Sequence, residues 1–323
     1  MKRVMTLLVA ACAAAGVYAA PAQMQAIVQG DSGLSLQSVQ TPKAGPGQVL
    51  VRVYAAGVNP VDWKRKPSVP GFDAAGVIEG VGPDVTSFKP GDAVVARVSG
   101  GYAQYALAQA EEVVAKPRSL TYEQASGMPV AGVAAYRAAM EAKIKPGQRV
   151  AVIGAAGGSG SVAVQVAKAQ GAHVIAIGHS SQKDFLTELK ADEFIAYDRD
   201  NVAAKVKDVD AVLNMVDGQA TPGLGYVKRG GNLASIAGNV PSKEQCAAAG
   251  VTCVQIGGTS GYGGISNGTA LAGLSALADK GQYTVRVSKT FPLAQAAAAQ
   301  ELNRTSDTIG KIVLVVDPRS REH

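Results

Sequence analysis

The sequence predicts an α/β fold built in two parts, and three features of its pattern support this prediction. From residue 24 to about residue 116, short alternating apolar segments are separated by proline and glycine, which is typical of an all-β region with a barrel-like outline. Near Thr121 the apolar residues begin to recur at helical spacing. From residue 148 onward, strand-like and helix-like segments alternate, which predicts a parallel sheet with right-handed crossovers.

The first part of the chain is expected to hold five strands followed by one helix. The expected strands cover residues 23–30, 48–58, 74–82, 91–98 and 101–109, and turn-forming residues bound them. The helix is expected over residues 121–143, where apolar residues recur at helical spacing. Thr121 followed by Glu123 and Gln124 is a suitable start signal for it.

The second part alternates strands with helices. Strands are expected over residues 148–154, 173–178, 193–197, 209–216 and 231–238, and helices over residues 160–170, 181–191 and 267–281. The last segment, residues 283–317, has the pattern of a strand, a helix and a strand. We expect its strands to rejoin the β region of the first part.

Composition limits the classes of partner. The chain has 323 residues, 47% hydrophobic and 17% charged, which is enough for a packed core in one or two domains. Its formal net charge is +6, and without the two positive charges of Lys2 and Arg3 it is +4. The other lysines and arginines are scattered instead of forming basic runs, so we expect no nucleic-acid partner.

The N-terminus has the three parts of a secretory signal: a basic start, an apolar stretch over residues 4–17, and small residues near the end. We therefore expect a signal peptide over residues 1–22, cleaved after Ala19 or Ala22, and a periplasmic or secreted protein. The alternative is an apolar N-terminal helix on a cytoplasmic protein. The apolar stretch is too short for a membrane span, so none is expected in the mature chain.

Two cysteines remain beyond the predicted signal peptide, Cys246 and Cys253. In an oxidising compartment such a close pair is a candidate disulfide. In a cytoplasmic protein the two residues would be independent small buried side chains. Their spacing does not suit zinc, because no histidine or further cysteine lies near them.

A glycine-rich turn separates the strand at 148–154 from the helix at 160–170. Glycines let the backbone approach a pyrophosphate closely, and the helix N-terminus offers unpaired N–H groups and a positive dipole end. The alternative is a tight turn between two core elements. We predict nucleotide binding, because a second strand follows at the expected distance. The residues of this turn assigned to the cofactor are Gly154, Ala156, Gly157, Gly158, Ser159 and Gly160.

The residues at the end of the next strand indicate whether the cofactor is NADH or NADPH. In an NADH site an acidic residue there would hold the ribose 2′-hydroxyl. After residue 178 the chain has no carboxylate until Asp184. Ser180 and Lys183 suit a 2′-phosphate instead, so NADPH is expected in preference to NADH. The alternative for Lys183 is a solvated surface lysine.

Several long motifs between Met24 and Asp317 resemble the medium-chain dehydrogenase/reductase superfamily, and within it the zinc-independent quinone oxidoreductase branch. They include "AAGVNPVDWK", "PGFDAAGVIEGVGPDVTSFKPGDAV", "KPGQRVAVIGAAGGSGSVAVQVAKAQGAHVIA" and "GKIVLVV". The resemblance implies a GroES-like β-barrel domain and a Rossmann doubly wound parallel-sheet domain, with the active site between them. It places the first domain at residues 23–120, completed by 284–323, and the second at 121–283. It also implies a homodimer.

The resemblance bears on metal chemistry. Zinc-dependent relatives carry a cysteine and a His–Glu pair where this chain has Asn59, Phe72 and Asp73, so no catalytic zinc is expected. Asn59 is the predicted catalytic residue, beside the nicotinamide. Its alternative role is that of a turn residue before Pro60. Four further residues lie around the same element without a ranking among them: Tyr54, Asp62, Trp63 and Lys64.

Further cofactor contacts are expected along the strand ends. They are Tyr197, Val216, Ala237 and Gly257, with Asn214 and Gly258 nearby. The implied activity is NADPH-dependent transfer of hydride to a quinone or an α,β-unsaturated carbonyl, a small-molecule substrate. The alternative is an exported, non-catalytic descendant of the fold that acts as a binding protein, because an exported protein meets no reduced nicotinamide pool.

Overall fold

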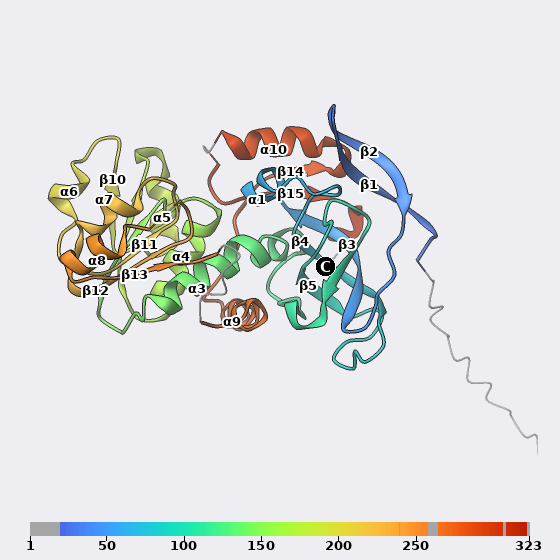
Figure 1. The fold of residues 1–323 in the computed structure, drawn as a ribbon, viewed down its shortest axis with the longest axis horizontal. Coiled ribbons are helices and arrows are strands. Elements are labelled where there is room, and N and C mark those ends of the chain that lie inside the picture. Colours follow the sequence, from blue (N-terminus) through green and yellow to red (C-terminus); the bar gives the residue numbers. More distant parts are fainter. Residues whose placement is uncertain (1–19, 239, 258–263, 306–307, 322–323) are drawn as a thin grey trace, which may run out of the picture.

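The computed structural model describes residues 20–238, 240–257, 264–305 and 308–321. Residues 1–19 of the predicted signal peptide lie outside these ranges. Figure 1 shows two lobes side by side. We call the lobe that contains the seven-stranded sheet the β lobe, and the lobe that contains the six-stranded parallel sheet the α/β lobe. The predicted α/β fold class, with a β-rich part and a parallel-sheet part, is confirmed.

The β lobe contains a hairpin and a mixed sheet. The hairpin strands are β1 (Gln23–Gly30) and β2 (Gly33–Gln40). The sheet strands are, in spatial order, β14 (Val287–Pro292), β15 (Lys311–Val315), β3 (Gln48–Gly57), β4 (Asp73–Val81), β5 (Ala93–Arg97) and β7 (Val113–Ala115), with β6 (Tyr105–Gln109) paired to β3. The last two strands of the chain therefore rejoin the first part, as predicted. Val49, Val51 and Val53 of β3 are buried with Ile78 of β4 in one apolar core.

The α/β lobe contains six parallel strands. In spatial order they are β10 (Glu193–Ala196), β9 (His173–Gly178), β8 (Arg149–Ile153), β11 (Val209–Asn214), β12 (Val227–Ser235) and β13 (Thr252–Gln255). Alternate residues of β8 pack into two different cores, Val150 and Val152 into one, and Ala151 and Ile153 into the other. Both faces of this sheet are thus covered, which explains its continuous apolar strands.

Helices connect these strands and cover the sheets. They are α1 (Pro60–Lys64), α2 (Tyr122–Ala125), α3 (Val133–Glu141), α4 (Gly158–Ala169), α5 (Lys183–Glu188), α6 (Val202–Lys205), α7 (Ala220–Leu224), α8 (Lys243–Ala249), α9 (Asn267–Asp279) and α10 (Ala296–Arg304). In Figure 1, α9 lies below and between the two lobes, and α10 lies over the β lobe. No helix within the described ranges combines the length and the apolar character that crossing a membrane requires.

The prediction of one helix over residues 121–143 was wrong. The segment divides into α2, a π-helical turn at Met128–Gly132, and α3. The backbone N–H of Val130 donates to the Asp73 carboxylate at 2.8 Å instead of continuing a regular helix. Pro129, just before it, has no N–H to donate. A hydrogen bond from another part of the chain therefore decides where this helix is interrupted.

Some elements gave no clear signal in the sequence. Strand β2 is mostly exposed and pairs only with β1, so it lacks the buried apolar face that identifies a strand. Strand β7 has three residues, and helices α1, α6 and α7 have four or five. Elements of this length are too short to show a period.

Cys246 and Cys253 form a disulfide that joins α8 to β13, with their Cα atoms 6.2 Å apart. Cys246 is buried, and its strand partner lies on the last strand of the parallel sheet. The bond closes the short connection between the two elements. Such a closed loop restricts the unfolded chain and stabilises the fold.

Replacing both cysteines by serine should lower the free energy of unfolding by about 2–3 kcal/mol, the amount that closing so short a loop supplies in the chain-entropy model. Urea denaturation of the native and double-serine proteins measures this difference. Alkylation followed by peptide mass mapping gives the pairing. The peptides that carry Cys246 and Cys253 should take up label only after reduction, and labelling of both without a reductant would contradict the bond.

Candidate active site

A cleft of about 960 Å³ lies between the two lobes at the carboxyl ends of β8 and β11. The strand order reverses between these two neighbours, because β9 and β10 lie on one side and β12 and β13 on the other. Open α/β sheets bind their ligands outside such a reversal, where the flanking loops diverge. Gly154 and Val216 line the cleft from the α/β lobe, and Asn59 and Lys311 line it from the β lobe.

The glycine turn after β8 depends on two of its glycines. Gly154 has a φ of +75°, and a Cβ there would lie 2.1 Å from Val216 Cγ2. A Cβ on Gly160 would lie 2.0 Å from the carbonyl oxygen of Gly154. Gly157 differs, because its φ is −69° and a Cβ there would meet only that same oxygen at 3.6 Å. The backbone therefore requires the first and third glycines but not Gly157.

Gly157 is the N-cap residue of α4, and no side chain caps this twelve-residue helix. The first N–H groups of a helix lack intrahelical partners and form the positive end of its dipole. The residues that begin α4, Gly158 to Gly160, line the cleft. An uncapped helix start with small residues at the reversal point of the sheet suits the pyrophosphate of a dinucleotide.

Most of the predicted site residues come together in this cleft. Those that line it are Asn59, Gly154, Ala156, Gly157, Gly158, Ser159, Gly160, Tyr197, Val216 and Ala237. Ser180, Lys183 and Gly257 are not among its lining residues, and Gly258 lies outside the described residues. Asn214 is fully buried and donates to Ser235 Oγ at 2.8 Å, so it supports the strand ends from behind.

Ser180 is engaged by a residue that the sequence analysis missed. Its backbone N–H and its hydroxyl both donate to the Asp198 carboxylate, each at 2.7 Å. Desolvation raises the pKa of Asp198, but the hydrogen bonds from Ser180 outweigh it, so the pKa is lowered and the group stays ionised. The sequence did contain a signal that could have identified Asp198: it directly follows Tyr197, at the end of the strand next to β9.

Asn59 is held by a buried ion pair. Its amide Nδ2 donates to Asp73 Oδ2 at 2.7 Å, and its Oδ1 accepts from Lys311 Nζ at 2.5 Å. Lys311 and Asp73 lie 3.6 Å apart and are almost fully buried. Burial raises the pKa of Asp73, and the positive charge of Lys311 partly reverses this increase. Burial lowers the pKa of Lys311, and the negative charge of Asp73 partly reverses this decrease. Both polar ends of Asn59 are therefore occupied within the protein.

Asp62 is a second buried carboxyl behind Asn59. Its Oδ2 accepts from the Asn59 backbone N–H at 2.8 Å and from the Tyr102 hydroxyl at 2.9 Å, while its Oδ1 has no hydrogen-bond partner. Burial, with the nearby Asp73 charge, raises the pKa of Asp62 to about 7. Asp62 therefore holds a proton to a higher pH than an exposed aspartate does.

The four residues expected around Asn59 without a ranking differ in whether they line the cleft. Lys64 lines the cleft and pairs with Asp217 of the opposite lobe, Nζ to Oδ2 at 3.5 Å. Trp63 points to α10, where its Nε1 donates to Asn303 at 3.3 Å. Tyr54 is buried against Tyr122. Together with the buried Asp62, this leaves Lys64 as the one of the four that reaches the cleft.

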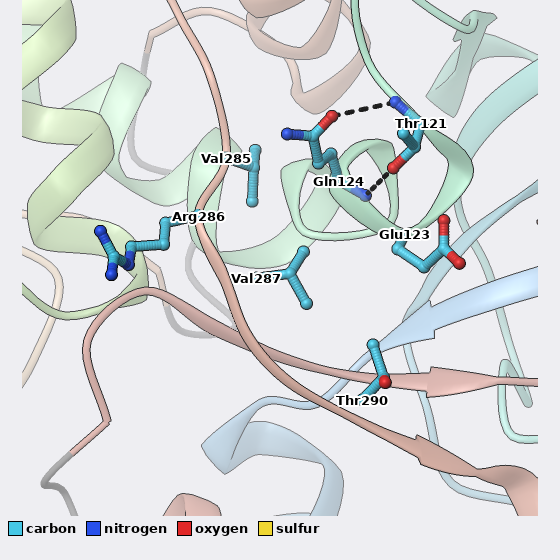
Figure 2. Close-up of a pocket in the computed structure, with 7 residues that line it drawn as sticks. All are labelled: Thr121, Glu123, Gln124, Val285, Arg286, Val287 and Thr290. Atoms are coloured by element: carbon cyan, nitrogen blue, oxygen red, sulfur yellow. Dashed lines mark hydrogen bonds between the residues drawn. The ribbon is translucent and has the colours of Figure 1, made fainter. Parts of the chain in front are cut away.

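A second hollow lies beside α2 (Figure 2), lined by Thr121, Glu123, Gln124, Val285, Arg286, Val287 and Thr290. Thr121 and Gln124 use their polar atoms on each other in the helix cap, as the dashed lines in the figure show. Arg286 pairs with Glu188 at 3.4 Å. Thr121, Gln124 and Arg286 thus have partners within the fold, and the cleft between the lobes, where the predicted residues gather, is the candidate site.

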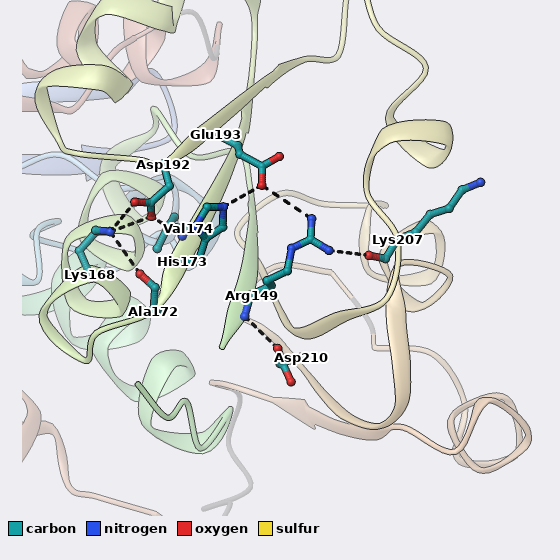
Figure 3. Close-up of polar contacts among 9 residues, drawn as sticks. All are labelled: Arg149, Lys168, Ala172, His173, Val174, Asp192, Glu193, Lys207 and Asp210. Carbon is teal, nitrogen blue, oxygen red and sulfur yellow. Dashed lines mark hydrogen bonds and ion pairs between the residues drawn. The ribbon is translucent and has the colours of Figure 1, made fainter. Parts of the chain in front are cut away.

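His173 belongs to a polar cluster at the amino ends of the strands (Figure 3). Its Nε2 lies 2.7 Å from Glu193 Oε1, and Arg149 is 3.7 Å from the same carboxylate oxygen. These residues begin β9, β10 and β8, at the edge of the sheet opposite the cleft. His173 therefore takes part in an ion-pair cluster at the edge of the sheet away from the cleft.

The Asp62 carboxyl should make stability depend on pH. Its pKa is about 7 in the folded protein, so the folded state holds a proton that the unfolded state releases above about pH 4. This contribution is complete below about pH 4 and is lost as the pH rises through 7. Asp62→Asn mimics the protonated form, so urea denaturation from pH 5 to 8 should show the native protein losing stability relative to this variant. A constant difference would contradict the shifted pKa.

Lys311→Met should lower the free energy of unfolding by about 3–5 kcal/mol, because it leaves Asp73 as a buried carboxyl without its cation. Urea denaturation at pH 8 measures the loss. Lys207→Met removes an exposed lysine and serves as the control, with little change expected. The double variant Lys311→Met with Asp73→Asn should recover part of the stability, since no unpaired charge remains.

Two family profiles match the chain. Residues 45–118 match the one described as "Alcohol dehydrogenase GroES-like domain", and residues 189–314 match the one described as "Zinc-binding dehydrogenase". The first match falls within the β lobe. The second includes β10 to β13 and continues to β15.

Relatives and solved structures agree with these matches. An NADPH-dependent alkenal/one oxidoreductase of Arabidopsis thaliana is 30% identical over 92% of this chain and 81% of its own. A quinone oxidoreductase of Mus musculus is 31% identical over 88% of this chain and 94% of its own. An alcohol dehydrogenase superfamily protein from Novosphingobium aromaticivorans superposes with a TM-score of 0.82 at 29% identity, covering 91% of this chain and all of that one. The chain thus belongs to the medium-chain dehydrogenase/reductase superfamily.

Proposed function

We propose that this protein is a zinc-independent, NADPH-dependent oxidoreductase that reduces a quinone or an α,β-unsaturated carbonyl in the cleft between its lobes. Relatives with these activities in their names support the substrate class. The observation that carries the proposal is the uncapped start of α4 at the reversal point of the parallel sheet, facing Asn59 and Lys311 across the same cleft.

The cofactor would lie along the carboxyl edge of the parallel sheet. Its pyrophosphate suits the turn from Gly154 to Gly160, where small residues allow close approach of the backbone. Tyr197, which follows β10, is 57% exposed and lines the cleft, and it would cover the adenine end. Val216 and Ala237 lie toward the other end, so the nicotinamide would come to rest near Asn59.

The chemistry divides between cofactor and protein. When bound, NADPH supplies the hydride. A quinone that accepts a hydride also takes up a proton to become a hydroquinone, and an enone takes the hydride at its β-carbon and a proton at its α-carbon. The protein positions the reactants and limits water in the cleft. Asn59, with both amide ends fixed by Asp73 and Lys311, acts here as a rigid positioning residue beside the reacting atoms.

The donor set argues for chemistry without zinc. Asp73 Oδ1 accepts from the Val130 N–H, and Oδ2 faces Asn59 and Lys311, so a neighbouring ammonium group already neutralises this carboxylate. Phe72 offers no ligand atom. Within the described part of the chain, no group of three or more His, Cys, Asp and Glu side chains is placed to hold a metal ion.

We further propose that residues 23–120 with 284–323 form the substrate domain and residues 121–283 the nucleotide domain, a division that the membership of the two sheets supports. The disulfide between Cys246 and Cys253 supports an oxidising compartment, in line with a signal peptide. We also propose a homodimer that pairs through β13, one of the two edge strands of the parallel sheet.

Gly157→Asp tests the nucleotide site directly. A side chain fits at this position, and aspartate is a preferred N-cap, so the melting temperature of the protein without cofactor should stay the same or rise. The added carboxylate would repel the pyrophosphate and occupy the helix N–H groups. We expect isothermal titration to show NADPH binding weakened at least about 100-fold, a loss typical of an unpaired like charge in a binding site.

Gly157→Asn is the matched control, because it has the same shape without the charge. It should weaken NADPH binding less than Gly157→Asp does. Equal, tight binding of NADPH by all three proteins would place the nucleotide elsewhere. Absence of NADPH binding by the native protein would contradict the proposed function and favour a non-catalytic binding protein.

Activity assays with a panel of quinones and alkenals then identify the substrate class. NADPH oxidation, followed by absorbance at increasing substrate concentration, should saturate with at least one of the two classes. Dialysis against a strong chelator should leave the rate unchanged, because the proposed chemistry uses no zinc. A rate that falls on chelation and returns with added zinc would overturn that part of the proposal.

A further inference from the structure

The contact between Ser180 and Asp198 lies beside the part of the cleft where the adenosine end of the cofactor is expected. Ser180 follows β9 and Asp198 follows β10, and these parallel strands are neighbours. Their carboxyl ends therefore lie side by side. Gly178, Gln182 and Tyr197, from the same two strand ends, line the cleft itself. The Ser180–Asp198 pair thus stands at the edge of the proposed cofactor site.

Asp198 uses both donors that Ser180 offers. The Ser180 N–H donates to Oδ1 and the hydroxyl to Oδ2, both at 2.7 Å. Short, paired hydrogen bonds to an ionised acceptor are among the stronger ones in proteins. Ser180 is therefore not free to donate to a phosphate unless this pair opens.

Basic side chains lie around Asp198. His179 Nε2 lies 3.5 Å from Oδ2, and Arg199 Nε lies 3.7 Å from the same oxygen. Lys183 is exposed at the start of α5, the helix that follows Ser180. The edge of the site thus holds cations that suit a 2′-phosphate, together with a carboxylate that repels one.

A ribose 2′-hydroxyl and a 2′-phosphate need opposite partners. The hydroxyl donates to a carboxylate, which is how many dinucleotide sites select NADH. A phosphate accepts hydrogen bonds and is drawn to cations, so it gains from Lys183 and loses against Asp198. The carboxylate absent from the expected position after β9 is supplied from the neighbouring strand by Asp198.

We infer, on the basis of the proposed function, that Asp198 is a specificity residue that narrows the preference for NADPH over NADH by holding Ser180 and by placing a negative charge at the 2′ position. The protein then accepts both cofactors. Lys183 favours the phosphate, Asp198 opposes it, and the balance between them sets the ratio of the two affinities.

Asp198→Asn tests the sign of this effect. It keeps an acceptor for Ser180 but removes the charge. Isothermal titration with NADPH and NADH, and with 2′,5′-ADP and 5′-AMP as probes of the adenosine end alone, gives the affinity ratios. We expect the ratio in favour of the 2′-phosphate form to rise about tenfold in both pairs, the effect of relieving one like-charge contact.

Asp184→Asn is the matched control, because it removes an exposed carboxylate next to Lys183 and leaves both hydrogen bonds from Ser180 to Asp198 in place. Its affinity ratio should change much less than that of Asp198→Asn. Lys183→Ala should shift the ratio the other way, toward NADH. Melting temperatures without ligand report whether each variant is folded.

Two outcomes would overturn the inference. If Asp198 only orients Ser180 toward the phosphate, Asp198→Asn will lower the affinity for 2′,5′-ADP and NADPH. If the pair lies outside the site, the ratio will stay unchanged. Both differ from failure of the proposed function, in which the native protein binds neither NADPH nor NADH and no ratio exists for any variant.

Discussion

The Asp73–Lys311 ion pair joins parts of the chain that are distant in sequence, and the geometry of the cleft depends on it. Asp73 lies on β4 and Lys311 on β15, and between them they hold the Asn59 amide and the Val130 N–H. A buried carboxylate is costly unless a cation and hydrogen bonds compensate it. Here each partner of Asp73 comes from a different segment, so the segments must meet for either charge to be tolerated.

The start of β15 also contacts the glycine turn on the other side of the cleft. The Gly310 N–H donates to the Ala156 carbonyl at 2.9 Å, and a Cβ on Gly158 would lie 2.9 Å from Lys311 Cδ. The ion pair and the glycine turn are therefore in direct contact. The position of the start of α4 relative to Asn59 follows from this contact, which links the anion-binding end of the site to its reacting end.

The start of α4 lacks a stabilising side-chain cap, and this suits the proposed binding of a pyrophosphate. The N-cap of α4 is a glycine, although aspartate, asparagine or serine at this position would cap the helix better. The N–H groups that such a side chain would satisfy are the ones that a pyrophosphate needs. Lys64 and Asp217 pair across the mouth of the cleft while both remain largely exposed, so their contribution to stability is small. Hydrogen bonds from backbone N–H groups connect the two parts of the chain instead, from the Val130 N–H to Asp73 and from the Gly310 N–H to the Ala156 carbonyl.

The sequence by itself determined the α/β class, five of the six strands of the parallel sheet and the glycine turn, because these depend on local period and on residues close together in the chain. It missed β13, which has only four residues. It could not determine the break in the helix at 121–143, since the cause is Asp73, far away in sequence. It placed Ser180 at the cofactor but missed Asp198, because only the pairing of β9 with β10 brings the two together. Tertiary structure decided which polar groups already have hydrogen-bond partners within the protein. This matters because a polar group that is already paired differs chemically from a free one.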